Sequence, residues 1–493
     1  MTAPPVFRIA DIALYERPVR LRLPFRFGVV TLTEAPQAFV RLRIELPGGR
    51  SYWGAAAELM VPKWFDKDPA LSNEQNFDQL RLSLQAAAAA YLSDAAPHTA
   101  FGHSAAHHRA LVEAGAAQGL NPLVAAYGPA LLDRAVIDAL CRGYRASFVA
   151  VLRKNAFGLE AATLTPDLAG FDIGAFLEQM PAPRQIAARH TVGMLDPLAE
   201  ADLPMEKRLG DGLPETLEAA VAAQGLRFFK LKVGGNQADD LKRLRAIAEV
   251  LDRNPLPYQA SLDGNEQYED VDGIASLWHA MRAEPRLRRL CGSILYIEQP
   301  IRRAAALSRP VDLLADEIPL IVDESDADYD VFPQARTLGY RGISSKTCKG
   351  IWRAILNAAR CRQWNGGSAV PKYFITGEDL TCQAGLALQQ DLALVAVLGL
   401  RHVERNGHHY VDGFGDAPAG EQAGFLAAHP DLYHGDGGRT RLTIRNGDIA
   451  LGSIMDAPGF GSTAEPDWAS LTAMPAAGQN FSESDFPRKD HQT

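Results

Sequence analysis

From residue 185 onward, short apolar segments alternate with segments whose apolar residues recur three and four positions apart, such as 238–253 and 351–364. The short segments predict strands and the longer ones predict helices. Strands that alternate with helices indicate a parallel sheet covered by helices, and eight such units within about 240 residues match a (β/α)8 TIM-type barrel. The predicted strands are 185–191, 228–233, 258–263, 294–299, 319–324, 342–346, 373–378 and 401–405.

The region before the barrel has a different pattern. Residues 9–17 and 38–46 read as strands, and Pro24-Phe25-Arg26-Phe27-Gly28 between them reads as a loop. Residues 74–95 and 104–150 are alanine-rich and read as helices, so this region is an α+β unit.

The region after the barrel contains a hairpin signal, Asn446-Gly447 within 439–451, and we expect this hairpin to return to the first unit. The polar end is expected to be disordered. The predicted divisions are 1–184 for the α+β unit with an inserted helical region, 185–425 for the barrel, 426–478 for the returning segment and 479–493 for the tail.

Composition narrows the function classes. The 493-residue chain is 47% hydrophobic and carries 50 basic against 59 acidic residues, a net charge of −9, without a basic stripe. That balance argues against nucleic acid or an anionic membrane as the main partner. No apolar run is long enough to cross a bilayer, the start does not resemble a secretory signal, and five scattered cysteines suit a reducing compartment. We expect a cytoplasmic protein.

Ionisable residues stand at the ends of six consecutive predicted strands, each about one strand–helix unit from the next. A single charge at a strand end is usually a solvated cap or an ion pair, but six in succession are difficult to explain in that way. In a barrel the carboxyl ends of all strands meet at one mouth, where active sites lie. The residues are Lys230 and Lys232, Asp263, Glu298, Asp323 with Glu324, Lys346, and Glu378 with Asp379.

Three of these carboxylates, Asp263, Glu298 and Asp323, come from adjacent strands and would repel one another in a partly buried site. A hard cation cancels that repulsion and prefers oxygen ligands, so they are candidate ligands of Mg²⁺, with Mn²⁺ as an alternative. Lys232 and Lys346 would flank the cation from opposite sides. We expect the neighbouring positive charge to lower their pKa values and suit them to proton transfer.

At these residues the chain resembles the enolase superfamily, and within it the muconate lactonizing enzyme-like subgroup of the mandelate racemase/muconate lactonizing enzyme family. The resemblance extends to two N-terminal segments that match the loops closing over the substrate in that family, and to a C-terminal segment. The motifs are KLK at 230–232, DGN at 263–265, EQP at 298–300, DES at 323–325, SKTCKG at 345–350, PFRFG at 24–28, GAAAE at 54–58 and APGFG at 457–461.

The resemblance implies a modified TIM-type barrel with an α+β capping domain built from the N-terminal region and the C-terminal segment. It implies that Asp263, Glu298 and Asp323 bind Mg²⁺ and that Lys232 and Lys346 are an acid/base pair, with Lys230 steadying Lys232. Asn265 and Glu324 would support the metal ligands, although both also suit plain turns. From their position at the end of the seventh strand, Glu378 and Asp379 are expected to contact substrate or to form an ion pair with Lys346.

The expected reaction is Mg²⁺-dependent removal of the proton alpha to a carboxylate, through an enediolate whose charge needs positive charge placed beforehand. Two opposed lysines favour racemisation or epimerisation of a small-molecule carboxylate. A dehydratase or a lactonizing cycloisomerase would use the same half-reaction. Alternatives of another class are a non-catalytic carboxylate-binding protein and a scaffold that works through its insertion. We also expect a homo-oligomer; the residues do not identify the substrate.

The chain departs from the family in length, with extra residues in 60–130 and 152–184 that could reshape the pocket, mediate assembly or decorate the surface. Lys349 competes with Lys346 as the sixth-strand lysine, and Lys346 is preferred because it ends the strand. Weaker candidates are His408 and His409 after the eighth strand, and three aromatic residues of the closing segments, Phe27, Trp53 and Trp64.

Overall fold

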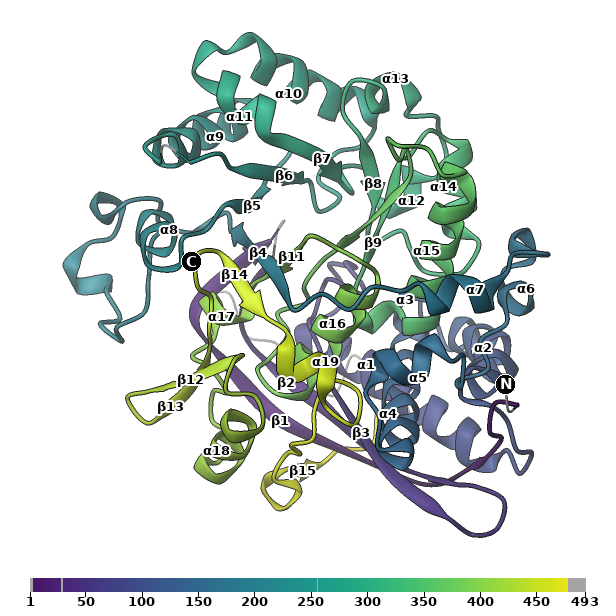
Figure 1. The fold of residues 1–493 in the computed structure, drawn as a ribbon. Coiled ribbons are helices and arrows are strands. Elements are labelled where there is room, and N and C mark those ends of the chain that lie inside the picture. The colour runs from purple at the N-terminus through teal and green to yellow at the C-terminus, as the bar shows by residue number, and fades with distance from the viewer. Residues whose placement is uncertain (1–2, 28–29, 255, 478–493) are drawn as a thin grey trace.

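A closed parallel barrel forms the centre of the molecule (Figure 1). The computed structural model describes residues 3–27, 30–254 and 256–477. Strands β4 to β11 follow one another in chain order, and β11 pairs with β4 to close the ring. All eight strand predictions are confirmed within two residues. The strands are β4 (Gln185–Val192), β5 (Phe228–Lys232), β6 (Gln259–Asp263), β7 (Ile294–Glu298), β8 (Leu320–Val322), β9 (Gly342–Ser345), β10 (Phe374–Gly377) and β11 (His402–Arg405).

Helices cover the outside of the barrel, because apolar residues occupy the face of each helix that meets the strands; α9, for example, buries Leu244, Ile247 and Leu251. In the described residues, no helix is both long and apolar enough to span a membrane. The barrel helices are α8 (Leu217–Gln224), α9 (Gln237–Asp252), α10 (Val271–Ala283), α11 (Arg288–Ser293), α12 (Arg303–Ala306), α13 (Asp312–Ala315), α14 (Val331–Thr337), α15 (Ile351–Asn365) and α16 (Leu386–Val397).

An antiparallel sheet from both ends of the chain caps the barrel. It has the order β15-β1-β2-β3 and is covered by α4, which packs on β3 and β2. Its elements are β1 (Arg8–Phe27), β2 (Val30–Glu45), β3 (Ser51–Leu59) and β15 (Thr472–Ala473), followed along the chain by α1 (Asn73–Ser93), α2 (Ala100–Ala117), α3 (Pro122–Ala125), α4 (Tyr127–Tyr144), α5 (Phe148–Arg153), α6 (Ala161–Leu164) and α7 (Ile173–Glu178).

Two segments expected to be loops are strands. Residues 24–27 of PFRFG end β1, where Phe25 is paired with Leu32 of β2 after a register shift that begins at Arg20. Pro24 lies in the shifted stretch, where its missing N–H breaks no ladder bond; Gly28 lies outside the described residues. GAAAE belongs to β3, and its residues are small because α4 approaches closely: a Cβ on Gly54 would lie 2.1 Å from Ala135 O.

The helical region predicted over 104–150 is confirmed and is divided into several helices. Gly119, with φ of +78°, ends the first part, and Pro122 begins the short helix α3 at a position where its missing N–H costs nothing. The chain then continues through α4 and α5.

The hairpin predicted over 439–451 is confirmed only at its turn, where Arg445 and Asp448 form an antiparallel bridge around Asn446-Gly447. The strands on either side of the turn pair elsewhere. Residues Arg439–Leu442 (β13) pair with Tyr433–Asp436 (β12), whereas Asp448–Ala450 (β14) pairs with barrel strand β4. The return to the N-terminal sheet is made later, where Thr472 of β15 pairs with Glu16 of β1. Three short helices complete the region: α17 (Gly407–Tyr410), α18 (Ala419–Ala428) and α19 (Gly452–Asp456). The predicted tail, residues 479–493, lies outside the described residues.

A buried ion pair joins the capping sheet to the barrel. Arg134 of α4 is fully buried and donates to Glu58 of β3 at 2.5 Å and to Gln390 of α16 at 2.9 Å. Glu58 also accepts from Thr347, the residue after Lys346, at 3.1 Å. Burial raises the pKa of Glu58 even though Arg134 opposes that effect.

Replacing Arg134 with methionine should therefore lower the free energy of unfolding by about 3–5 kcal/mol, because it leaves a buried carboxylate without its partner. Urea unfolding followed by circular dichroism measures the loss. The double variant Arg134→Met with Glu58→Leu should recover most of the stability. A single variant as stable as the wild type would show that the pair does not hold the two parts together.

Buried histidines make the fold acid-sensitive. His190 of β4 and His409 of α17 lie with ring centroids 4.9 Å apart, and burial lowers the pKa of each to about 3. An exposed imidazole titrates near pH 6.5, so the unfolded chain binds more protons than the folded chain below that pH. The contribution of these histidines to the free energy of unfolding is thus fully present above about pH 6.5 and is lost as the pH falls below that value.

Melting temperatures between pH 7 and pH 5 test this expectation. Replacing His409 with glutamine should flatten the decline, whereas the same change at the exposed His279 should not. Equal slopes in the two variants would exclude the buried histidines as its cause.

Candidate active site at the carboxyl ends of the barrel strands

The predicted ionisable residues come together at one end of the barrel. Lys230 and Lys232 end β5, Asp263 ends β6, Glu298 ends β7, and the rest directly follow β8, β9 and β10. All are buried: the side chains of Asp263, Glu298 and Asp323 are at most 1% exposed. The convergence follows from parallel pairing, which places Lys232 beside Asp263 and Asp263 beside Glu298 in register.

Lys230 lies at the centre of the carboxylates. Its Nζ is 2.9 Å from Asp263 Oδ2, 2.8 Å from Glu298 Oε2 and 2.8 Å from Glu378 Oε2. A fourth carboxylate, Glu404 of β11, is 2.9 Å away. A single ammonium therefore compensates four buried carboxylates in part, and the side chain is held rigidly from all sides.

The other two lysines each contact a different carboxylate. Lys232 Nζ lies 2.6 Å from Asp263 Oδ2, and Lys346 Nζ lies 2.6 Å from Asp323 Oδ2. Lys349 approaches Asp323 less closely, at 3.4 Å, and pairs with Asp326 at 3.0 Å. The cavity at the mouth is lined by Lys230, Lys232 and Lys346. Lys349 lines a separate small cavity.

The protein's own groups shift two lysine pKa values in the direction opposite to that expected beside a cation. Burial lowers the pKa of Lys346, but the Asp323 carboxylate acts in the opposite direction and the net pKa is raised. The pKa of Lys230 is raised in the same way, by Asp263, Glu298 and Glu378. The expected lowering depends on a bound cation beside the lysines, so it stays a prediction.

The pKa values of Asp323 and Glu298 are shifted in opposite directions. Burial acts to raise the pKa of Asp323, but Lys346 and Lys349 hold it well below its usual range. Burial and the neighbouring Asp263 and Glu378 carboxylates push the pKa of Glu298 well above its usual range. Glu298 is the middle one of the three predicted metal ligands. Of these three carboxylates, it is the one whose negative charge the neighbouring lysines compensate least.

The donor set suits a hard cation in its chemistry. Three carboxylates on adjacent strands provide oxygen ligands, and beside them the buried oxygens Asn265 Oδ1 and Glu324 Oε2 have no hydrogen-bond partner within the described ranges. Lysine ammonium groups, however, already contact these carboxylates. Among the described residues, no three acidic, histidine or cysteine side chains are grouped as a metal site. Lys230 lies between Asp263 and Glu298, so a cation needs those oxygens to turn away from the ammonium group.

Asn265 and Glu324 lie against each other beside the carboxylates. Asn265 Nδ2 donates to Glu324 Oε1 at 3.2 Å, and Asn265 N donates to Asp263 Oδ1 at 2.9 Å. The backbone here is in the left-handed region, with φ of +40° at Asn265, +67° at Glu266 and +31° at Gln299. Such conformations cost free energy in residues other than glycine, and they are concentrated at functional sites.

A segment of the predicted insertion covers the mouth. Trp64 stacks over Lys346, with Nζ 4.2 Å from the ring centre, and Phe25 lies on the Lys232 side, 6.0 Å from its Nζ. The cavity between them holds about 20 Å³. Trp53 instead stacks with Arg41, and the side chain of Phe27 lies outside the described residues. The cover therefore leaves little room for water around the lysines.

Ion pairs fasten this cover to the barrel. Lys67 Nζ lies 2.6 Å from Glu266 Oε2 and 2.7 Å from Asn265 O, while Arg303 of α12 donates to Trp64 O and Phe65 O, each at 2.8 Å. Glu266 also accepts from Arg303, which holds both cations together. The strained turn after β6 is thus fixed by the same residues that hold Trp64.

Glu378 and Asp379 form ion pairs with groups other than Lys346. Glu378 pairs with Arg189 of β4 and with Lys230, and accepts from Tyr296 at 3.1 Å. Asp379 lies 3.3 Å from Arg405 and accepts from Asn406 N at 2.7 Å. Asp379 nevertheless lines the mouth cavity.

Sequence reasoning missed Glu404 and Arg189. Glu404 lies in the predicted eighth strand and shares the strand-end signal of the other carboxylates, so it could have been found. Arg189 lies within the predicted first strand and had no separate signal. His408 and His409 do not join the site: both contact His190, at ring-centre distances of 5.5 Å and 4.9 Å.

Comparison with known proteins places this site in context. Residues 212–468, just over half of the chain, match the family described as enolase C-terminal domain-like. No curated protein sequence matches the chain.

Several solved structures share the fold. A dipeptide epimerase from Enterococcus faecalis V583, complexed with Mg and the dipeptide L-Leu-L-Tyr, is 14% identical, with 92% of this chain and 99% of that one covered and a TM-score of 0.57. A 2-chloromuconate cycloisomerase from Rhodococcus opacus 1CP is 14% identical over 93% and 97%, with a TM-score of 0.55. An enolase from Bradyrhizobium, complexed with magnesium and mandelic acid, is 16% identical over 94% and 97%, with a TM-score of 0.56.

Proposed function

Because the chain belongs to the enolase C-terminal domain-like family, we propose that it is an enzyme that removes the proton alpha to a carboxylate, and that it racemises or epimerises its substrate. Lys232 and Lys346 carry the proposal. They come from β5 and β9, which are four strands apart in a ring of eight and thus face each other across the barrel, and both line the mouth cavity.

The opposed lysines fit a two-base exchange. A substrate carbon held between them presents its hydrogen to one lysine, which must be the neutral amine to accept it, and its opposite face to the other lysine, which must be the ammonium to deliver a proton. Lys346 accepts the proton from one enantiomer and Lys232 delivers a proton to the opposite face, and the roles reverse for the other enantiomer. Lys232 contacts Asp263 and Lys346 contacts Asp323, so each lysine nitrogen atom lies beside one of the predicted metal ligands.

Asp263, Glu298 and Asp323 would hold the Mg²⁺ ion. When bound, Mg²⁺ supplies the positive charge that makes the alpha proton of a carboxylate acidic enough to remove. Lys230 fixes Asp263 and Glu298, and Asn265 with Glu324 supports the end of β6. The cover formed by Trp64 and Phe25 excludes water from the lysine nitrogen atoms.

Solvent-deuterium incorporation tests the proposal. The protein with Mg²⁺ in deuterium oxide is incubated with single enantiomers of chiral carboxylates, including N-acylated and N-methylated amino acids and 2-hydroxy acids. Proton NMR follows the alpha signal and chiral chromatography follows the configuration. Exchange with inversion supports racemisation or epimerisation.

The alternatives give different signals in the same assay. Exchange together with loss of a beta substituent or ring closure would assign a dehydratase or a cycloisomerase with the same lysines. Mg²⁺-dependent binding of a carboxylate whose alpha proton never exchanges would contradict catalysis and indicate a carboxylate-binding protein.

A further inference from the structure

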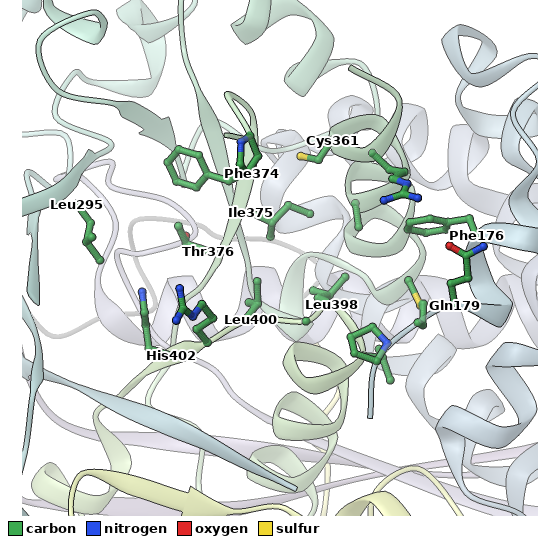
Figure 2. A pocket seen from close by; sticks show the side chains of 18 of the residues that line it. Phe176, Gln179, Leu295, Cys361, Phe374, Ile375, Thr376, Leu398, Leu400 and His402 are labelled. Carbon is green, nitrogen blue, oxygen red and sulfur yellow. The ribbon is translucent and has the colours of Figure 1, made fainter. Parts of the chain in front are cut away.

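Two cavities of the described chain lie away from the mouth, at the amino ends of the barrel strands. One of about 710 Å³ is lined by Leu295 near the start of β7, Phe374 at the start of β10 and His402 at the start of β11 (Figure 2). Its volume falls within the range of small-molecule sites, whereas the mouth cavity holds about 20 Å³. We call it the floor cavity.

Its walls are mostly apolar. Figure 2 shows Ile375, Leu398 and Leu400 at its centre and Phe176 of α7 on the far side from His402. Phe176 belongs to the segment 152–184, which the sequence identifies as extra. That segment therefore has a structural consequence, since it builds one wall of a cavity on the barrel floor.

The polar groups of the floor cavity are basic or neutral. Arg362 of α15 and Arg401 before β11 line it and are exposed, and neither forms an ion pair with a residue in the described ranges. The lining contains no aspartate or glutamate. Thr376, labelled within the cavity in Figure 2, is 4% exposed, and its hydroxyl has no hydrogen-bond partner among the described residues.

A second cavity of about 710 Å³ shares Leu295, Arg401 and His402 with the first. Its one acidic residue, Asp448, is already paired with Arg227 at 2.9 Å. The shared region is thus positive on balance, and Arg401 stands where the two cavities meet.

We propose that the floor cavity is a second binding site, which takes a small carboxylate with an apolar body. The apolar body would replace water against Ile375, Leu398 and Phe176, and the carboxylate would pair with Arg362 or Arg401, whose planar guanidinium groups match it. Tyr296, which lines this cavity, donates to Glu378, and Glu378 in turn pairs with Lys230 of the mouth.

Calorimetry with octanoate as the probe tests the site, in the absence of Mg²⁺. Octanol and octylamine carry the same chain with a neutral and a positive end, and we expect octanoate to bind most tightly. The double variant Arg362→Gln with Arg401→Gln should weaken octanoate binding by roughly five- to tenfold and leave octanol unchanged. The control double variant Arg288→Gln with Arg309→Gln removes two exposed arginines elsewhere and should bind as the wild type does.

Two further variants locate the probe. Leu400→Trp fills the cavity and should abolish binding of octanoate and octanol alike, while circular dichroism confirms that it folds. Lys232→Ala should leave octanoate binding unchanged, so the result does not depend on the proposed catalysis.

Three results would overturn the proposal: no octanoate binding in the millimolar range, equal affinities for octanoate and octylamine, or octanoate binding that Lys232→Ala abolishes. If octanoate does not bind and Leu400→Trp changes the sedimentation coefficient, the floor is instead a surface between two copies of the chain.

Discussion

Replacing Lys346 with alanine should abolish racemisation of both enantiomers and leave slow alpha-proton exchange from only one. The remaining base, Lys232, lies across the barrel and can reach only the hydrogen that points toward it. Lys232→Ala should give the mirror-image result. We expect each substitution to lower the rate of alpha-proton exchange from the affected enantiomer by about 10²–10⁴-fold, the usual contribution of a positioned acid or base.

Enantiomer-resolved NMR exchange rates measure these effects. Lys242→Ala, which removes an exposed lysine from α9, is the matched control and should retain wild-type rates. Loss of exchange from the same enantiomer in both lysine variants would contradict the two-base arrangement. The same assay decides between the two sixth-strand lysines. If Lys349→Ala keeps wild-type exchange and Lys346→Ala loses it, Lys346 is the base.

Removing one carboxylate from the predicted metal ligands should greatly weaken Mg²⁺ binding. Glu298→Gln keeps the shape of the side chain but removes the charge at the middle of the three, so we expect a loss of about 100-fold or more in affinity, beyond the 10–100-fold of an outer-shell change. Asp263→Asn and Asp323→Asn should behave similarly. Isothermal titration calorimetry with MgCl₂ measures the change.

Glu249→Gln provides the control, because it removes one exposed carboxylate from α9. Its Mg²⁺ affinity should equal that of the wild type. If Glu298→Gln also binds Mg²⁺ normally, the three carboxylates serve only as partners of the buried lysines, and the proposed reaction loses its cation.

The barrel and the convergence of its charged residues could be predicted because both depend on short-range patterns. Parallel strands between helices give a repeated apolar segment, and the end of each strand gives the position of the mouth. Asp263, Glu298 and Lys346 were therefore found from position alone, although their separation in sequence is large.

The rest depended on contacts that no local pattern records. Residues 24–27 carry turn signals, yet 25–27 pair with 30–32 because the β1–β2 ladder resumes after Pro24. Lys67 and Arg303, which lie far apart in the sequence, both form ion pairs with Glu266 of a third segment. The direct contact between each lysine and a carboxylate was not predicted either: Asp323 lies 2.6 Å from Lys346 Nζ and raises the pKa of that lysine.

Anomalous scattering from crystals soaked in Mn²⁺ tests the central claim most directly, because it needs no substrate. A single strong peak contacted by Asp263, Glu298 and Asp323, with Lys232 and Lys346 on opposite sides of it, is the predicted result. A peak elsewhere, or no peak while the Lys230 ammonium still lies between Asp263 and Glu298, would contradict the account.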